Sequence, residues 1–174
     1  ASPGGIGGVL LDRARVAAYF EDGVTDEDIR ILGVRIGDHR SQSLLEGLAM
    51  LVALRLFAPM AGYVAPGFGV AYLAVKSDSK AALGAAISLS SPSEAMNAIG
   101  REMAFDAATG DYQVTLFDHV PGVANKVPDW LSRVRRPPES GTAGPRPLSL
   151  VDAEQVKVPP RNDAWWRTRK MPPS

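Results

Sequence analysis

Three acidic residues occupy comparable positions along this chain. Glu46 lies in the first turn of a predicted helix, Asp78 follows a predicted strand, and Asp129 begins the last predicted helix. Carboxylates at such positions stay ionised, because the positive ends of backbone N–H dipoles favour the anion. If the three converge, their oxygens suit hard divalent cations such as Mg²⁺. Two such ions about 4 Å apart could activate water and stabilise the leaving oxygen of a phosphodiester.

Each of these acids also has a purely structural interpretation. Glu46 is the fourth residue of the stretch 43–46 (SLLE), which has the pattern of a capping box. Asp78 could cap the helix that follows it, and Asp129, next to Pro128, could complement a helix dipole. Spacing alone does not decide between capping and metal binding, so both interpretations stay open at this level.

The apolar pattern predicts the elements that must position the acids. Strands are predicted at 6–11, 16–20 and 29–34, helices at 43–57, 79–89, 91–108 and 128–134, and two further strands at 70–75 and 112–120. The first three strands are joined by short turns, which is typical of an antiparallel meander. Strands followed by strand–helix alternation predict an α/β fold with one mixed sheet and helices on its faces.

Composition excludes several classes of function. The 174 residues carry 19 basic and 19 acidic side chains, and this zero net charge argues against a polycationic binder of nucleic acid or membranes. The chain contains no cysteine, which excludes a disulfide scaffold, a thiolate zinc site and a cysteine nucleophile. No secretory signal is visible at its start, so we expect a protein that is not secreted.

The composition changes sharply after Arg136. Residues 137–174 hold eight of the 14 prolines and few core-forming side chains. Such a stretch offers little apolar surface to offset its ordering entropy. We therefore predict a folded unit over 1–136 and an extended, mostly disordered tail over 137–174. Trp165 and Trp166, among basic residues, are either a short docking motif or incidental residues of that tail, and the composition favours the second interpretation.

Four stretches of the chain carry a resemblance to a known family. They are 1–10 (ASPGGIGGVL), 46–54 (EGLAMLVAL), 75–83 (VKSDSKAAL) and 119–133 (HVPGVANKVPDWLSR). The last is similar to the ending H-[IV]-P-G-x-x-N-x-x-A-D-x-L-S-R. Together, and in this order, the stretches resemble the ribonuclease H domain of a retrotransposon reverse transcriptase polyprotein.

This resemblance implies both a fold and an activity. The fold would be a ribonuclease H-like five-stranded mixed sheet, with three antiparallel strands and then two more, flanked by helices. The activity would be hydrolysis of the RNA strand of RNA–DNA hybrids with two Mg²⁺ or Mn²⁺ ions. The implied partners are the hybrid and the adjacent reverse transcriptase domain of the same polyprotein, in an intracellular compartment and without a membrane.

The resemblance also implies roles for individual residues. Glu46, Asp78 and Asp129 match the metal-binding catalytic carboxylates, and His119 matches a loop histidine that assists proton transfer or product release. Contacts to nucleic acid are expected from Ser79, Lys80, Asn125 and Lys126. The family's first aspartate would stand immediately before Ala1. The alternative is therefore a catalytically inactive ribonuclease H-like domain that serves as a nucleic-acid clamp or structural connector. An integrase- or resolvase-type nuclease is a further alternative, against which the ending 119–133 argues.

Overall fold

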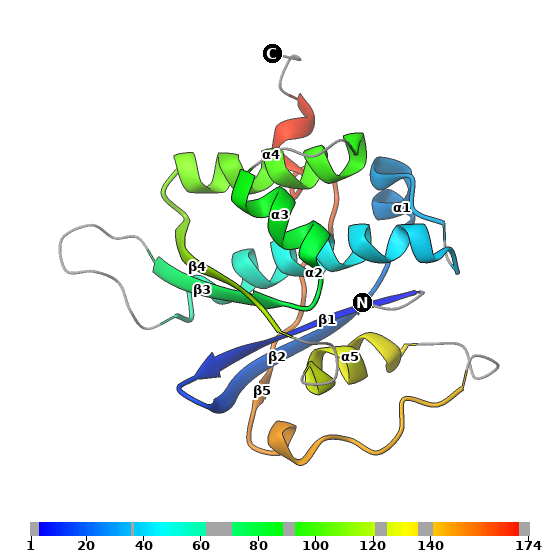
Figure 1. Cartoon of the computed structure of the whole chain (residues 1–174), viewed down its shortest axis with the longest axis vertical. Coiled ribbons are helices and arrows are strands. Elements are labelled where there is room, and N and C mark those ends of the chain that lie inside the picture. The colour runs from blue at the N-terminus through cyan, green and yellow to red at the C-terminus, as the bar shows by residue number, and fades with distance from the viewer. Residues whose placement is uncertain are drawn as a thin grey trace.

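The computed structural model describes residues 4–35, 37–61, 71–88, 93–120, 125–135 and 141–170. Strands and helices are mixed along this length, beginning with two strands in succession (Figure 1). The elements are β1 (Gly5–Asp12), β2 (Arg15–Gly23), α1 (Asp26–Leu32), α2 (Gln42–Phe57), β3 (Ala71–Ser77), α3 (Lys80–Ser88), α4 (Glu94–Ala108), β4 (Tyr112–His119), α5 (Lys126–Arg133) and β5 (Glu154–Gln155). The predicted α/β class is confirmed.

The described strands form two separate sheets. β1 and β2 make an antiparallel hairpin, and β5 lies parallel to the other edge of β2. β3 and β4 form a parallel pair of their own. Most predicted elements are confirmed within a few residues, including the buried helix α2, the strands β3 and β4, and the short helix α5.

The predicted third strand at 29–34 is wrong, because these residues begin inside α1. Thr25 caps this helix: its hydroxyl accepts a hydrogen bond from Asp28 N at 3.1 Å, and the Asp28 carboxylate accepts one from Thr25 N at 2.9 Å. Gly33 ends the helix with a left-handed φ of 62°. The β-branched residues of the segment favoured a strand, but these two caps fix a helix instead.

Two glycines let α5 lie directly on β1. A Cβ atom added at Gly7 would come within 2.5 Å of Leu131 Cβ, and one at Gly5 would overlap the Ser132 carbonyl. On the opposite face of β1, Ile6 is fully buried in the main core, which α2 also lines. The β1–β2 hairpin is therefore covered by α2 on one face and by α5 on the other (Figure 1).

The main core lies between the hairpin and the helices α2, α3 and α4. α2 supplies eight buried side chains to it, which explains why this helix is apolar on almost every side. A smaller cluster on the α5 side contains Val16, Tyr19, Leu131 and Leu150. Within the part of the chain that the structure describes, no helix is both long and apolar enough to cross a bilayer.

The C-terminal segment 141–170 packs against the rest of the chain. β5 continues the sheet at β2, Leu150 is fully buried, and Trp166 is 1% exposed in the main core. The structure differs here from the expected disordered tail with incidental tryptophans. The segment contains few apolar side chains, which is why disorder was expected. Its composition could not show that its arginines form ion pairs with buried carboxylates elsewhere in the fold.

Candidate functional site

Asp78 and His119 lie at the same end of the β3–β4 pair, where both strands reach their carboxyl ends. Ser77, the last residue of β3, is in register with His119, the last residue of β4. Val120 N also donates a hydrogen bond to Ser77 O at 3.0 Å. Asp78 is half-buried and His119 is exposed. Because ligands of open parallel sheets bind outside the carboxyl ends of the strands, this edge is the natural place for a site.

Ser79, rather than Asp78, caps helix α3. The Ser79 hydroxyl accepts a hydrogen bond from Ala82 N at 3.1 Å, and its carbonyl accepts one from Leu83 N at 3.0 Å. The capping interpretation of Asp78 is therefore wrong, and its carboxylate is not used in this cap. Ser79 is buried, so the hydroxyl expected to contact nucleic acid is engaged inside the protein. The next residue, Lys80, is exposed at the start of α3.

Glu46 lies on α2, one turn after the helix begins. The helix starts at Gln42, so Ser43 is inside it and the predicted capping box over 43–46 does not form. Instead, Gln42 Nε2 donates a hydrogen bond to Glu46 Oε1 at 2.9 Å. The carboxylate is half-buried, and capping does not account for it.

Asp129 lies in the first turn of α5 and is paired with an arginine. Arg133 Nε donates to Asp129 Oδ1 at 2.9 Å, and Arg133 Nη2 lies 2.9 Å from Oδ2. Asn125 is the half-buried N-terminal flanking residue of the helix, and Lys126 begins it with an exposed side chain. Pro128 occupies the first turn, where its missing N–H leaves no helix hydrogen bond unmade.

The described residues do not assemble the predicted metal site. Among them, no three acidic or histidine side chains are grouped closely enough to hold a metal ion. Carboxylate oxygens are suitable donors for Mg²⁺ or Mn²⁺. However, Asp129 is already neutralised by Arg133. The donor chemistry of Glu46, Asp78 and Asp129 therefore suits the ions, whereas their described arrangement does not fit a two-ion site.

Sequence reasoning missed a buried ionic cluster between α2 and α4. Arg55 Nη2 donates to Glu102 Oε2 at 2.5 Å, and Arg55 Nε donates to Asp106 Oδ2 at 2.8 Å. Tyr112 OH donates to the same Asp106 oxygen at 2.8 Å. Burial and the neighbouring Asp106 carboxylate raise the pKa of Tyr112. Glu102 and Asp106 lie among buried apolar residues of α4. Two acids four residues apart on an apolar helix face were the sequence signal that could have indicated this cluster.

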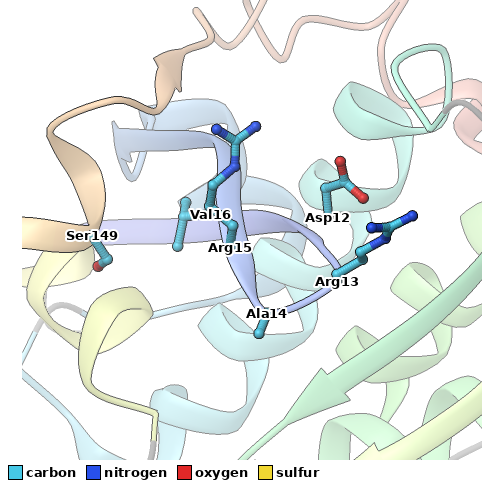
Figure 2. A pocket seen from close by; sticks show the side chains of 6 residues that line it. All are labelled: Asp12, Arg13, Ala14, Arg15, Val16 and Ser149. Carbon is cyan, nitrogen blue, oxygen red and sulfur yellow. The ribbon is translucent and has the colours of Figure 1, made fainter.

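An open hollow of about 670 Å³ lies at the turn between β1 and β2 (Figure 2). Its lining residues are Asp12, Arg13, Ala14, Arg15, Val16 and Ser149. Arg13 adopts a left-handed φ of 57° at this turn. The hollow is at the opposite end of β1 from Gly5 and contains none of the predicted site residues.

Comparison with protein-family models, with curated proteins and with solved structures finds no match for this chain. The ribonuclease H resemblance therefore stays an expectation based on four stretches of sequence. The functional proposal rests on those stretches and on the positions of their side chains in the fold.

Proposed function

We propose that this chain is a ribonuclease H-type domain of a reverse transcriptase polyprotein, which hydrolyses the RNA strand of RNA–DNA hybrids. The observation that carries the proposal is the shared strand edge of Asp78 and His119, set by the pairing of Ser77 with His119. An acid and an imidazole at the same carboxyl end of the pair provide a charged group and a proton carrier on one side of the fold. The exposure of His119 leaves its ring accessible to solvent and substrate.

The arrangement of elements supports the same proposal. The described parts of the four similar stretches fall on β1, on α2, across the end of β3 and the start of α3, and on the end of β4 and α5; residues 1–3 and 121–124 lie outside the described residues. Both α2, which carries Glu46, and α5, which carries Asp129, pack on β1. A ribonuclease H-like fold would join the β1–β2 hairpin and the β3–β4 pair in one sheet, whereas the described strands form two.

The proposal includes two Mg²⁺ or Mn²⁺ ions, whose chemistry would be to activate water and stabilise the leaving oxygen. For Asp129 to serve as a ligand, its carboxylate would have to give up the Arg133 guanidinium. The chain itself positions the two residues: the hydrogen-bonded pairing of β3 with β4 holds the backbone next to Asp78 and at His119.

Basic residues next to the acids are suited to phosphate contacts. Lys80 follows Asp78 by two residues and Lys126 precedes Asp129 by three, and both side chains are exposed. Lysines that neutralise phosphates favour binding without sequence preference. We expect recognition of a hybrid by its shape and its 2′-hydroxyls, since a protein distinguishes RNA from DNA through that group.

A non-catalytic ribonuclease H-like clamp is the second candidate. The ion pair between Asp129 and Arg133 favours it, because a neutralised carboxylate is a weaker cation ligand. Such a domain would bind a hybrid through the same basic residues without cutting it.

Cleavage of an RNA–DNA hybrid with labelled RNA, in Mg²⁺, distinguishes the two candidates. The arms are the chain itself, the chain with one Asp added before Ala1, and Asp78→Asn in both backgrounds. Asp12→Asn, an exposed acid at the far end of β1, is the matched control. RNA cleavage that Asp78→Asn abolishes and Asp12→Asn preserves supports the nuclease. Binding without cleavage in every arm supports the clamp, and neither binding nor cleavage contradicts both.

A further inference from the structure

The fold buries three carboxylates whose arginine partners come mainly from the C-terminal segment. Asp28, Glu102 and Asp106 are each 0% exposed. Within the described residues before 141, the arginine that reaches this set is Arg55, which contacts Glu102 and Asp106. The other arginine partners are Arg161 and Arg167 of the segment 141–170. With the segment in place three arginines match these three carboxylates, and the segment supplies two of the three. An unpaired buried charge is strongly destabilising, so each arginine matters.

Arg161 is the first anchor of the segment. Its side chain is fully buried, and its Nε lies 3.0 Å from each carboxylate oxygen of Asp28. Its Nη1 donates to Asp22 Oδ2 at 2.6 Å, and its Nη2 donates to Gly23 O at 2.6 Å. The guanidinium thus joins the end of β2 to the capped start of α1, with all three of its nitrogens hydrogen-bonded.

Glu102 of α4 provides the second anchor. Its carboxylate accepts hydrogen bonds from Arg167 N at 3.0 Å, Thr168 N at 2.8 Å and the Thr168 hydroxyl at 2.6 Å. Arg167 and Thr168 are the first residues of a 3-10 turn at Arg167–Lys170, and their N–H groups have no partner within the turn. Glu102 of α4 therefore binds the start of this turn. Arg55 adds a bond to Trp165 O at 2.5 Å, and its guanidinium carbon lies 4.5 Å from the centre of the Trp165 ring.

The earlier half of the segment holds the α5 side of the molecule. Trp130 Nε1 of α5 donates to Gly144 O at 3.1 Å, and Leu150 packs with Leu131 in the smaller apolar cluster. Val156 N then donates to Tyr19 O at 2.9 Å beside β5. Figure 1 shows the segment, in orange and red, running from the α5 side of the hairpin to α4.

We infer that residues 141–170 form a clasp that completes the charge pairing of the core, so that the clasp and the rest of the chain fold as one cooperative unit. The clasp supplies two of the three arginines that neutralise the buried acids, and its short strand β5 pairs with Ala18 and Tyr19 on the outer edge of β2. The inference does not depend on the proposed nuclease activity, because every contact in it is between residues of this chain.

Hydrogen exchange of the unmodified chain tests the inference directly. The amides of Val156, Arg167 and Thr168 report on the clasp, and the paired amides of β1 and β2 report on global unfolding. We expect protection factors in the two groups to agree within about tenfold, because one unit opens at one free energy. Clasp amides that exchange more than about a hundredfold faster than those of the hairpin would show that the segment opens alone, and would overturn the inference.

Substitution of the first anchor provides a second test. Arg161→Ala should lower the Tm by about 10 °C or prevent folding, whereas Lys157→Ala, which removes an exposed charge from the same segment, should leave it unchanged. The double variant Arg161→Gln with Asp28→Asn removes both charges and should recover part of the loss. Equal Tm values for Arg161→Ala and Lys157→Ala, or no recovery in the double variant, would contradict the charge-pairing basis of the clasp.

Discussion

Arg161 and Asp28 form an ion pair in which neither side chain is exposed to solvent, although 133 residues separate them in the chain. Burial by itself would lower the pKa of Arg161, but its hydrogen bonds to Asp28 and Asp22 and the charges of these acids raise that pKa. The guanidinium therefore stays charged, and Asp28 serves two segments at once because it also caps α1. One carboxylate therefore both caps α1 and fixes the clasp through Arg161.

Asp28→Asn should destabilise the protein by about 3–5 kcal/mol, because it leaves the Arg161 charge buried with only Asp22 to pair it. Asp26→Asn is the matched control: Asp26 is an exposed acid in the same helix turn, and its loss should cost about 0.3–1 kcal/mol. Urea denaturation measures both. Equal losses for the two variants would mean that the buried pair contributes no more than a helix-end charge.

Gly7→Ala should destabilise the protein by about 1–3 kcal/mol, since the new methyl group would push Leu131 and α5 away from β1. Gly84→Ala provides the control, because Gly84 lies on the exposed side of α3 with no atom within 4 Å of an added Cβ. That substitution should stabilise by about 0.5–1 kcal/mol through helix propensity. Thermal unfolding that ranks the two variants in the reverse order would rule out the close contact of α5 with β1.

Tyr112 should make stability fall at alkaline pH. Its pKa is raised in the folded state, so the folded protein keeps the phenol neutral while the unfolded chain ionises above about pH 10. The stabilisation is complete below that pH and declines as the pH rises towards the folded-state pKa. Denaturation at pH 8 and at about pH 11 should show this decline, and Tyr112→Phe should reduce it. An unchanged decline in the phenylalanine variant would assign it to other groups.

Asp129→Asn should reduce hybrid cleavage by about a hundredfold or more, because it removes a proposed ligand of the metal ion. The charge that such an ion stabilises in the transition state is worth several kcal/mol. Its effect on stability should be only about 0.3–0.5 kcal/mol, the usual worth of an exposed ion pair on a helix. Arg133→Gln breaks the same ion pair and keeps the carboxylate, so it should retain cleavage. If the two variants lose cleavage equally, the ion pair and not the carboxylate alone is what the reaction needs.

The sequence predicted those parts of the fold that depend on local pattern. The apolar stretch at 43–57 is the buried helix α2. The segment 29–34 was misread, because its β-branched residues favour a strand while Thr25, Asp28 and Gly33 cap a helix. Local pattern could not show the clasp, since the partners of Arg161 and Thr168 lie 133 and 66 residues away.

The candidate site was predictable in part for the same reason. Asp78 and His119 were placed at the ends of two strands, and the parallel pairing of β3 with β4 brings those ends together. The capping roles suggested for Glu46 and Asp78 were not realised, because α2 begins earlier and Ser79 caps α3. Spacing gave no information on Arg133, whose side chain pairs with Asp129 only once α5 has formed.

The rate of RNA-strand cleavage in a labelled RNA–DNA hybrid, measured in Mg²⁺ with and without Asp78→Asn, tests the proposed function most directly. The proposal predicts cleavage that needs the divalent ion and falls by about a hundredfold or more when Asp78 loses its charge. The Asp12→Asn control should cleave at the unchanged rate, and the Tm of both Asp78→Asn and Asp12→Asn should equal that of the unmodified chain. Cleavage of equal rate in the presence and absence of Asp78, or none in the chain and in its form with an added Asp before Ala1, would contradict it.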